Sequence, residues 1–283
     1  MAGGARAVTA QGSRGSRAQV VLVMPEFNEE RTVLGVLEEA APHVDRIIIV
    51  DDGSQDASHA RIVHWLRHAP VRVDLLRHAT NRGMSGALET GFARVQQLLA
   101  LGELGPDDVV VNLDADGQHD PAEIPLLVCH LQERRLDVAL GRRDLGGYPR
   151  YKVVGNRLLS LSGGLLAGYR YQDIECGFRV LRVATVGPLL EYFSGHRYGC
   201  AQEIGVILPR LGFRVDNRFA VRVRTYREGA RFRDGLVNAT MGLLAALRVL
   251  FRVRTRGTRR LTRLLASVQM NSGPGGAPLS SGG

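Results

Sequence analysis

The 283-residue sequence has almost no lysine, few cysteines and no long apolar run. Its three cysteines, Cys129, Cys176 and Cys200, are an odd number without close spacing. This pattern excludes a disulfide framework and a cysteine-based zinc site, and it favours a reducing compartment. No stretch reaches the roughly 18 apolar residues that a membrane-spanning helix needs. Residues 1–18 lack the apolar segment of a secretory signal, so a cytoplasmic protein is expected.

Arginine carries almost all of the positive charge. Lys152 is the only lysine, although Lys and Arg together number 37 against 28 Asp and Glu, which leaves a net charge of +9. Arginine is suited to paired hydrogen bonds with phosphate. The charge fits nucleic acid, an anionic membrane or phosphorylated substrates without choosing among them, and a GC-rich genome would explain the arginines equally well.

Apolar runs and helical patterns alternate between residues 20 and 140. The expected strands cover residues 20–24, 46–50, 71–76, 109–113 and 137–140, and the expected helices cover 29–40, 58–68 and 85–100. Asp120 followed by Pro121 predicts the start of a further helix. Continuous apolar strands that alternate with helices predict an α/β fold, with a mainly parallel sheet covered on both faces.

The pattern changes after Gly141, where glycine, arginine and aromatic residues mix in segments that look shorter. We predict one domain at 19–235, divided into a first half at 19–140 and a second half at 141–235. An amphipathic and basic segment is expected at 236–266. The tails at 1–18 and 267–283 are expected to be disordered.

The segment from Leu236 to Phe251 has helical spacing and is followed by an arginine-rich run. One expected face carries Leu236, Thr240, Leu243, Leu247 and Leu250, with Val237, Leu244 and Phe251 beside them. Other faces carry Asn238, Gly242, Ala245, Arg248 and Arg252. Two alternatives follow: an interfacial helix on anionic lipid, or a core helix with a solvated basic tail.

Polar residues follow each of the first four expected strands, at 25–29, 51–54, 81–86 and 114–119. Ligands of open parallel sheets bind outside the carboxyl ends of the strands. Asp114 and Asp116 would share one face of an extended segment and could hold a hard divalent ion together with a diphosphate. The alternative interpretation of this pair is an Asx-turn with a helix cap.

Several other classes fit less well. The first strand exits into Pro25-Glu26 rather than the glycine-rich turn of a dehydrogenase. A nucleotidyltransferase would favour a glycine-rich loop with lysine at this place, and none is present. Nucleic-acid binding through the arginines of 252–263 would leave the four polar loops unexplained, so no nucleic-acid partner is expected.

Together the segments resemble family 2 glycosyltransferases, in particular the dolichyl- or polyprenyl-phosphate mannosyltransferase subgroup. Residues 23–29 are similar to P-x-[YF]-N-E, residues 50–54 to V-D-D-G-S, and residues 113–121 to D-A-D-x-Q-H-x-P. The matching glycine-rich segment is 81–91, and residues 141–143 and 173–179 resemble G-S-R and D-x-x-x-G-F-R. The resemblance covers about residues 20–232 and implies a GT-A (nucleotide-diphospho-sugar transferase) fold, with a nucleotide-binding half at 19–140 and an acceptor half at 141–235.

The resemblance also implies roles for individual residues. The nucleotide-sugar would contact Pro25, Glu26, Asn28, Glu29, Asp51, Asp52, Asn81, Gly83, Asp114 and Ala115. The implied metal ligands for Mg²⁺ or Mn²⁺ are Asp114, Asp116 and Gln118. The implied catalytic set is Asp116, Arg143, Asp173 and Arg227, in which the arginines would neutralise phosphates.

The implied reaction is an inverting transfer of a mannose- or glucose-type sugar from a GDP- or UDP-sugar. A polyprenyl or dolichyl phosphate acceptor would be reached from the inner face of the cell membrane, and it needs no strong base. The alternative is a hydroxyl acceptor with a carboxylate base, for which Glu203 and Asp173 are candidates. The chain departs from the family at Arg142, where serine is usual, and at 228–232, and both departures concern the acceptor side.

Overall fold

The computed structural model describes residues 17–196, 199–224, 232–255 and 269–272. Its strands are β1 (Val20–Glu26), β2 (Arg46–Asp51), β3 (Arg72–Arg77), β4 (Val109–Asn112), β5 (Val138–Leu140), β6 (Arg142–Arg143), β7 (Arg179–Arg182), β8 (Val215–Asp216), β9 (Ala220–Val221) and β10 (Gln269–Ser272). Its α-helices are α1 (Val33–Ala40), α2 (Ser58–Leu66), α3 (Met84–Ala100), α4 (Ile124–Glu133), α5 (Arg150–Ala167), α6 (Val183–Tyr192), α7 (Cys200–Arg210) and α8 (Phe232–Leu250). Two short 3₁₀ helices are η1 (Ala41–His43) and η2 (Pro121–Glu123).

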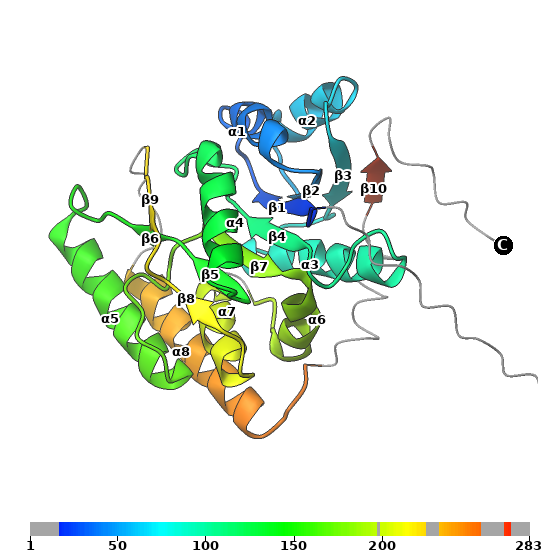
Figure 1. Ribbon diagram of the computed structural model, residues 1–283. Helices are drawn as coiled ribbons and strands as arrows, with labels where there is room; N and C mark the ends of the chain where they lie inside the picture. Colours follow the sequence, from blue (N-terminus) through cyan, green and yellow to red (C-terminus); the bar gives the residue numbers. More distant parts are fainter. Residues whose placement is uncertain (1–16, 197–198, 225–231, 256–268, 273–283) are drawn as a thin grey trace, which may run out of the picture.

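The main sheet has the order β10-β3-β2-β1-β4-β7-β5-β8 and lies between two helical layers (Figure 1). Helices α1, α2 and α4 cover one face, and helices α3, α6 and α7 contribute to the apolar cluster on the other. The central strand β1 is buried along its whole length, as its continuous apolar sequence predicts. Gly91 lets α3 lie close to this strand, because a Cβ atom there would be 2.4 Å from Val23 Cγ1.

The predicted α/β fold with a mainly parallel sheet is confirmed. Strands β3, β2, β1 and β4 are parallel neighbours. Two expected helix starts shift along the chain. Helix α1 begins at Val33 rather than near residue 29, because Asn28 has a positive φ of 56° and the segment after it forms a turn. The Asp120 side chain accepts from Ala122 N as expected, but the first turn is η2 and α4 starts only at Ile124.

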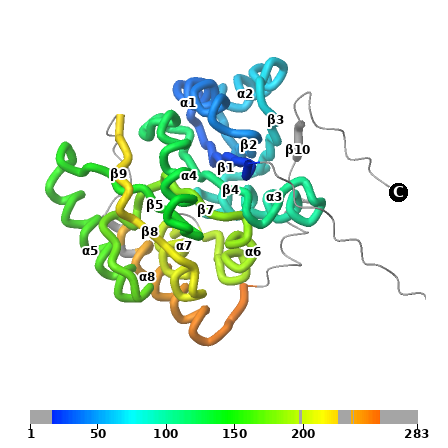
Figure 2. Tube along the Cα trace, viewed as in Figure 1, coloured from blue at the N-terminus to red at the C-terminus, as the bar shows by residue number. Residues whose placement is uncertain are grey.

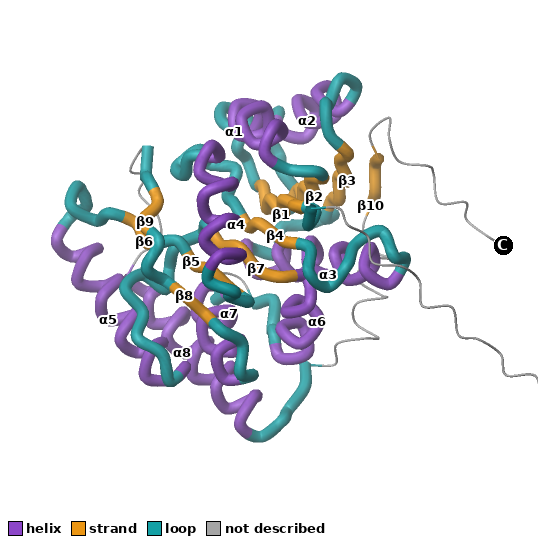
Figure 3. Tube along the Cα trace, viewed as in Figure 1, coloured by secondary structure: helices purple, strands orange, loops and turns teal. Residues whose placement is uncertain are grey.

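The second half of the chain completes the sheet and builds a helical layer beside it (Figure 3). Strand β7 enters antiparallel between β4 and β5, which the sequence pattern did not predict. The expectation of shorter segments is wrong for α5, which has 18 residues. Figure 2 shows that the yellow strands β8 and β9 lie beside the green strands β5 and β6, although the two pairs are far apart in sequence.

Strand β10 lies within the segment expected to be a disordered tail. It pairs antiparallel with β3 at the edge of the sheet. An edge strand can be held by backbone hydrogen bonds alone, so the apolar pattern used to predict strands does not detect it.

Helix α8 packs on α7 and α5 through its small residues. Gly242, Ala245 and Ala246 are buried together with Asn238 and Met241. The described residues Val237, Leu243, Leu244, Leu247 and Leu250 are instead 39–62% exposed, so these large apolar side chains do not form the face that packs on α5 and α7. Small residues allow the helices to approach closely. A Cβ atom at Gly242 would lie only 3.6 Å from Leu166 Cδ1 of α5.

Candidate active site

The exits of β1, β2, β3 and β4 meet in one cleft at the carboxyl edge of the sheet, as their sequence predicts. The cleft is lined by Pro25, Glu26, Phe27, Glu29, Asp52, Asn81, Gly83, Met84, Ala87, Asp114, Ala115 and Asp116. Nine of these residues are among those proposed from sequence; Phe27, Met84 and Ala87 are additional. The last two lie on the first turns of α3, and only the close packing of α3 on β1 brings them to the cleft.

Asp114 and Asp116 lie together on the wall of the cleft. Burial and then the charge of Asp116 raise the pKa of Asp114, although His119, Arg179 and Arg143 oppose that rise. The backbone N of Gln118 donates to Asp116 Oδ1 at 2.9 Å, so the Asx-turn interpretation is correct for the backbone. This turn uses only the Asp116 carboxylate. Two carboxylates that repel each other, as those of Asp114 and Asp116 do, are suited to binding a cation between them.

The turn after β2 is held by two carboxylates, those of Glu26 on β1 and Asp51 on β2, which both accept hydrogen bonds from Ser54. Glu26 Oε1 accepts from the Ser54 hydroxyl and from Glu29 N, each at 3.1 Å. Burial raises the pKa of Glu26 above its ordinary value. Asn28 Oδ1 accepts from Gln55 N at 2.8 Å and does not line the cleft. The P-E-F-N-E segment therefore builds the cleft wall as well as facing it.

The two consecutive aspartates at the end of β2 have different surroundings. Asp52 lines the cleft and fixes the glycine-rich segment, because its oxygens accept from Arg82 N at 2.9 Å and Gly83 N at 2.7 Å. Asp51 is fully buried away from the cleft and pairs with His59 and Arg77. The expected contact of Asp51 with the nucleotide therefore has no support in this geometry.

His78 is a contributor that the sequence did not reveal. Its Nδ1 lies 2.6 Å from Asp52 Oδ1, and its Nε2 lies 2.8 Å from the Thr90 hydroxyl on α3. A lone histidine after a strand carries no local signal, so only the tertiary structure identifies it.

Arg143 and Asp173 form a tight pair next to the cleft. Arg143 Nε donates to Asp173 Oδ2 at 2.8 Å, Nη2 donates to Oδ1 at 2.9 Å, and the Arg143 backbone N donates to Oδ2 at 3.0 Å. Burial alone would lower the pKa of Arg143, but the hydrogen bonds and charge of Asp173 raise it above its usual value. Because both carboxylate oxygens are engaged, Asp173 serves to orient the arginine.

Two other expected site residues, Glu203 and Gln118, are placed differently. Glu203 is fully buried and pairs with Arg248 Nη2 at 2.7 Å, and its side chain also accepts from Ser194. It anchors α8 on α7 and is wrong as a candidate base. The Gln118 side chain is not part of the cleft lining. Arg227 lies outside the described residues.

Gly177, within the D-x-x-x-G-F-R segment, allows Asp114 to take its place. A Cβ at Gly177 would lie 2.3 Å from Asp114 Oδ2, so any side chain at this position would force the Asp114 carboxylate to move. This glycine is part of the family motif, but its contact with Asp114 is visible only in the tertiary structure.

The comparisons agree with this geometry. The model of "Glycosyl transferase family 2" matches residues 21–186. A UDP-N-acetylglucosamine–dolichyl-phosphate N-acetylglucosaminyltransferase of Methanococcus voltae is 30% identical over 209 residues, which cover 68% of this chain and 80% of the relative. An undecaprenyl-phosphate mannosyltransferase of Micrococcus luteus is 29% identical over 206 residues, covering 70% and 80% of the two chains.

Among solved structures, glucosyl-3-phosphoglycerate synthase from Mycobacterium tuberculosis, in complex with Mn²⁺, UDP and phosphoglyceric acid, has a TM-score of 0.55 at 20% identity. The match covers 82% of this chain and 78% of that one. At this identity the likeness concerns the fold, and it confirms the expected GT-A architecture. The family match includes all four strand exits, the acidic pair and the Arg143–Asp173 pair, so the chain belongs to glycosyl transferase family 2.

Proposed function

We propose that this protein transfers a sugar, with inversion, from a nucleoside-diphosphate donor to a lipid phosphate at a membrane surface. The observation that carries the proposal is the position of Arg143. Its charge acts on Asp114 of the cleft, and its side chain is also linked to α5, where Asn156 Oδ1 accepts from Nη2 at 3.5 Å. A phosphate acceptor beside Arg143 would meet the donor cleft on one side and α5 on the other.

The donor is proposed to bind between the first four strand exits. Pro25, Glu26, Asp52 and Asn81 would surround the base and ribose, and Asp114 and Asp116 would lie toward the diphosphate. The Methanococcus voltae relative is named for a UDP-sugar, which favours UDP over GDP.

A divalent metal, Mg²⁺ or Mn²⁺, fits the acidic pair. The described residues include no cluster of three or more His, Cys, Asp or Glu that could enclose an ion. Two carboxylates are enough for a hard cation that also binds diphosphate oxygens. Such an ion would neutralise charge on the leaving diphosphate. Solved structures of the mycobacterial synthase contain Mn²⁺ together with UDP, which supports this choice.

The surroundings of the candidate bases favour a phosphate acceptor over a hydroxyl. Asp173 is committed to Arg143, and Glu203 is committed to Arg248. A phosphate monoester is already anionic at neutral pH, so its attack on the anomeric carbon needs positioning more than proton removal. Arg143 would hold this acceptor and stabilise its charge.

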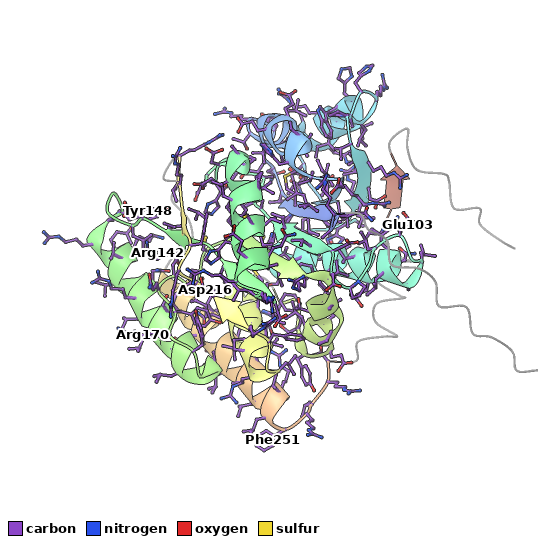
Figure 4. The ribbon with its side chains drawn as sticks, in the orientation of Figure 1. Glu103, Arg142, Tyr148, Arg170, Asp216 and Phe251 are labelled. Carbon is purple, nitrogen blue, oxygen red and sulfur yellow. The ribbon has the colours of Figure 1, made fainter. Side chains whose placement is uncertain are left out.

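The outer surfaces of α5 and α8 support access from a bilayer. On α5 the apolar side chains of Tyr151, Val154, Leu158, Leu161 and Leu165 recur at helical spacing and are 54–75% exposed. On α8 the residues Val237, Leu243, Leu244, Leu247 and Leu250 are 39–62% exposed, and Phe251 projects beyond the helix end (Figure 4).

The charge beside these stripes favours anionic lipid as their partner. Residues 150–170 and 235–260 contain no Asp or Glu, whereas Arg150, Arg157, Arg170 and Arg252 are exposed there. An apolar face flanked by arginines is suited to the interface of an anionic membrane. Among the described helices, none has the length and hydrophobicity needed to cross the bilayer. We therefore propose peripheral attachment through the outer faces of α5 and α8.

The acceptor assay tests the proposed function directly. Purified protein is incubated with radiolabelled UDP- or GDP-sugars, Mn²⁺ and either a polyprenyl phosphate, the dephosphorylated polyprenol or a soluble sugar. We expect label in the lipid fraction only with the polyprenyl phosphate, and with UDP-sugars ahead of GDP-sugars. Transfer to polyprenol or soluble sugar, and none to the phosphate, would establish the hydroxyl-acceptor alternative.

Membrane attachment should depend on the exposed leucines of α5. Leu158→Glu/Leu161→Glu is expected to weaken binding to phosphatidylglycerol vesicles at low salt by at least about tenfold, because it removes apolar area and adds negative charge. Co-sedimentation with the vesicles measures this. Leu126→Glu on α4 is the matched control, since Leu126 is 56% exposed outside the proposed surface. Equal weakening in the control, or no binding by the wild-type protein, would contradict the proposal.

A further inference from the structure

The segment from Asp173 to Gly177 connects parts of the site that come from distant regions of the chain. Asp173 holds Arg143, and the Ile174 backbone N donates to the Ser160 hydroxyl of α5 at 3.1 Å. Gly177 packs directly against Asp114. A displacement of this segment would therefore move the phosphate-binding arginine and one acidic residue of the cleft together.

Glu175, in the middle of the segment, contacts the helical layer through both of its carboxylate oxygens. Its Oε1 accepts from Gln202 Nε2 of α7 at 2.8 Å, and its Oε2 accepts from Asn238 Nδ2 of α8 at 3.0 Å. Gln202 is fully buried and Asn238 is 4% exposed. The carboxyl group thus attaches the segment to two helices at once.

The Gln202 amide occupies a narrow space that two glycines leave open. Its oxygen lies between α5 and α8, 2.6 Å and 3.2 Å from where Cβ atoms of Gly163 and Gly242 would be. Its nitrogen also donates to Leu159 O at 3.3 Å. Neither the Gln202 oxygen nor the Asn238 oxygen has a hydrogen-bond partner among the described residues. Reversing the Gln202 amide would break its bond to Leu159 O, whereas the Asn238 amide can reverse without losing an existing bond of its oxygen.

We infer that Glu175 is a positioning residue for the sugar transfer, acting through its hydrogen bonds to Gln202 and Asn238. It keeps the 173–177 segment in place, so that Arg143 and Asp114 remain aligned. A misplacement of about 1 Å far from the reacting atoms can reduce a rate by about a hundredfold. The inference rests on the proposed transferase function of the cleft, but not on the nature of the acceptor.

Two substitutions at this position separate positioning from acid–base chemistry. Glu175→Leu removes both hydrogen bonds while keeping a similar size. Glu175→Gln keeps both, because its oxygen can accept from Gln202 and its nitrogen can donate to a reversed Asn238 amide. The matched control is Glu38→Gln on the exposed side of α1.

The variants are compared for UDP binding with and without Mn²⁺ by calorimetry, for kcat and KM of transfer, and for thermal unfolding. We expect Glu175→Leu to weaken Mn²⁺-dependent UDP binding about tenfold and to lower kcat about a hundredfold. Glu175→Gln and the control should stay within about threefold of the wild type. A loss in Glu175→Gln as large as that in Glu175→Leu would assign chemistry to the carboxyl group and overturn the inference, as would wild-type values for a folded Glu175→Leu.

If Glu175→Leu does not fold, Asn238→Ala decides the question, because it removes only the bond to α8. A fall in kcat of about five- to tenfold supports the inference, and an unchanged kcat overturns it. The UDP-binding measurement distinguishes failure of the proposed acceptor from failure of the inference on Glu175. A wild-type protein that binds Mn²⁺ and UDP but transfers nothing to lipid phosphate contradicts the acceptor, while the effect of Glu175→Leu on binding still tests the inference.

Discussion

Asp116→Ala is expected to lower kcat by about a thousandfold, equivalent to about 4 kcal/mol of transition-state stabilisation. Asp116 lines the cleft beside Asp114, and the proposed metal would lose one of its two protein carboxylates. The folded state should be kept, because removing one of two repelling carboxylates from the cleft relieves Asp114. Initial rates with saturating donor, together with a thermal melt, measure the two effects.

The control for Asp116 is Asp107→Ala, since the Asp107 side chain is 91% exposed and remote from the cleft. It should keep the wild-type rate. A chelator should abolish the wild-type activity, and Mn²⁺ or Mg²⁺ should restore it. Full activity of Asp116→Ala in the presence of chelator would exclude the proposed metal site.

Arg143→Ala is expected to reduce both activity and stability. The variant leaves Asp173, whose side chain is 1% exposed, without its partner, and an unpaired buried charge costs about 3–5 kcal/mol. Loss of the arginine from the phosphate side should lower kcat by about a hundredfold or more. Denaturant unfolding and initial rates separate the two quantities.

The double variant Arg143→Ala/Asp173→Asn distinguishes the two roles of Arg143. It removes the unpaired charge, so most of the lost stability should return while the activity stays low. Recovery of activity along with stability would mean that Arg143 acts only in folding, and the phosphate role would then be withdrawn.

Much of the fold and part of the site could be predicted from local sequence patterns. The strands β1, β2 and β4 are continuous apolar runs, and the polar residues after them must meet at one edge of a parallel sheet. For this reason Asp52, Asp114 and Asp116 could be placed in one cleft from sequence alone. Strand β7 could not be oriented in the same way, since its pattern contains no information on direction.

The roles of individual charges depended on partners far along the chain. Asp51 and Asp52 are adjacent in the sequence, yet one pairs with His59 and Arg77 away from the cleft, and the other faces the cleft. Glu203 is a plausible base by its sequence, but Arg248, 45 residues away, makes it a structural ion pair.

The sequence by itself determined the α/β architecture, the acidic cleft and the family, because each follows from short periodic patterns and spaced motifs. Only the tertiary structure decided which face of α8 is buried and which carboxylates remain available in the cleft. The apolar pattern of α8 favours burial of its large residues. In the structure its small residues are buried instead, because they allow close packing on α5 and α7. Burial and ion pairing are set by contacts between distant segments, which a local pattern does not contain.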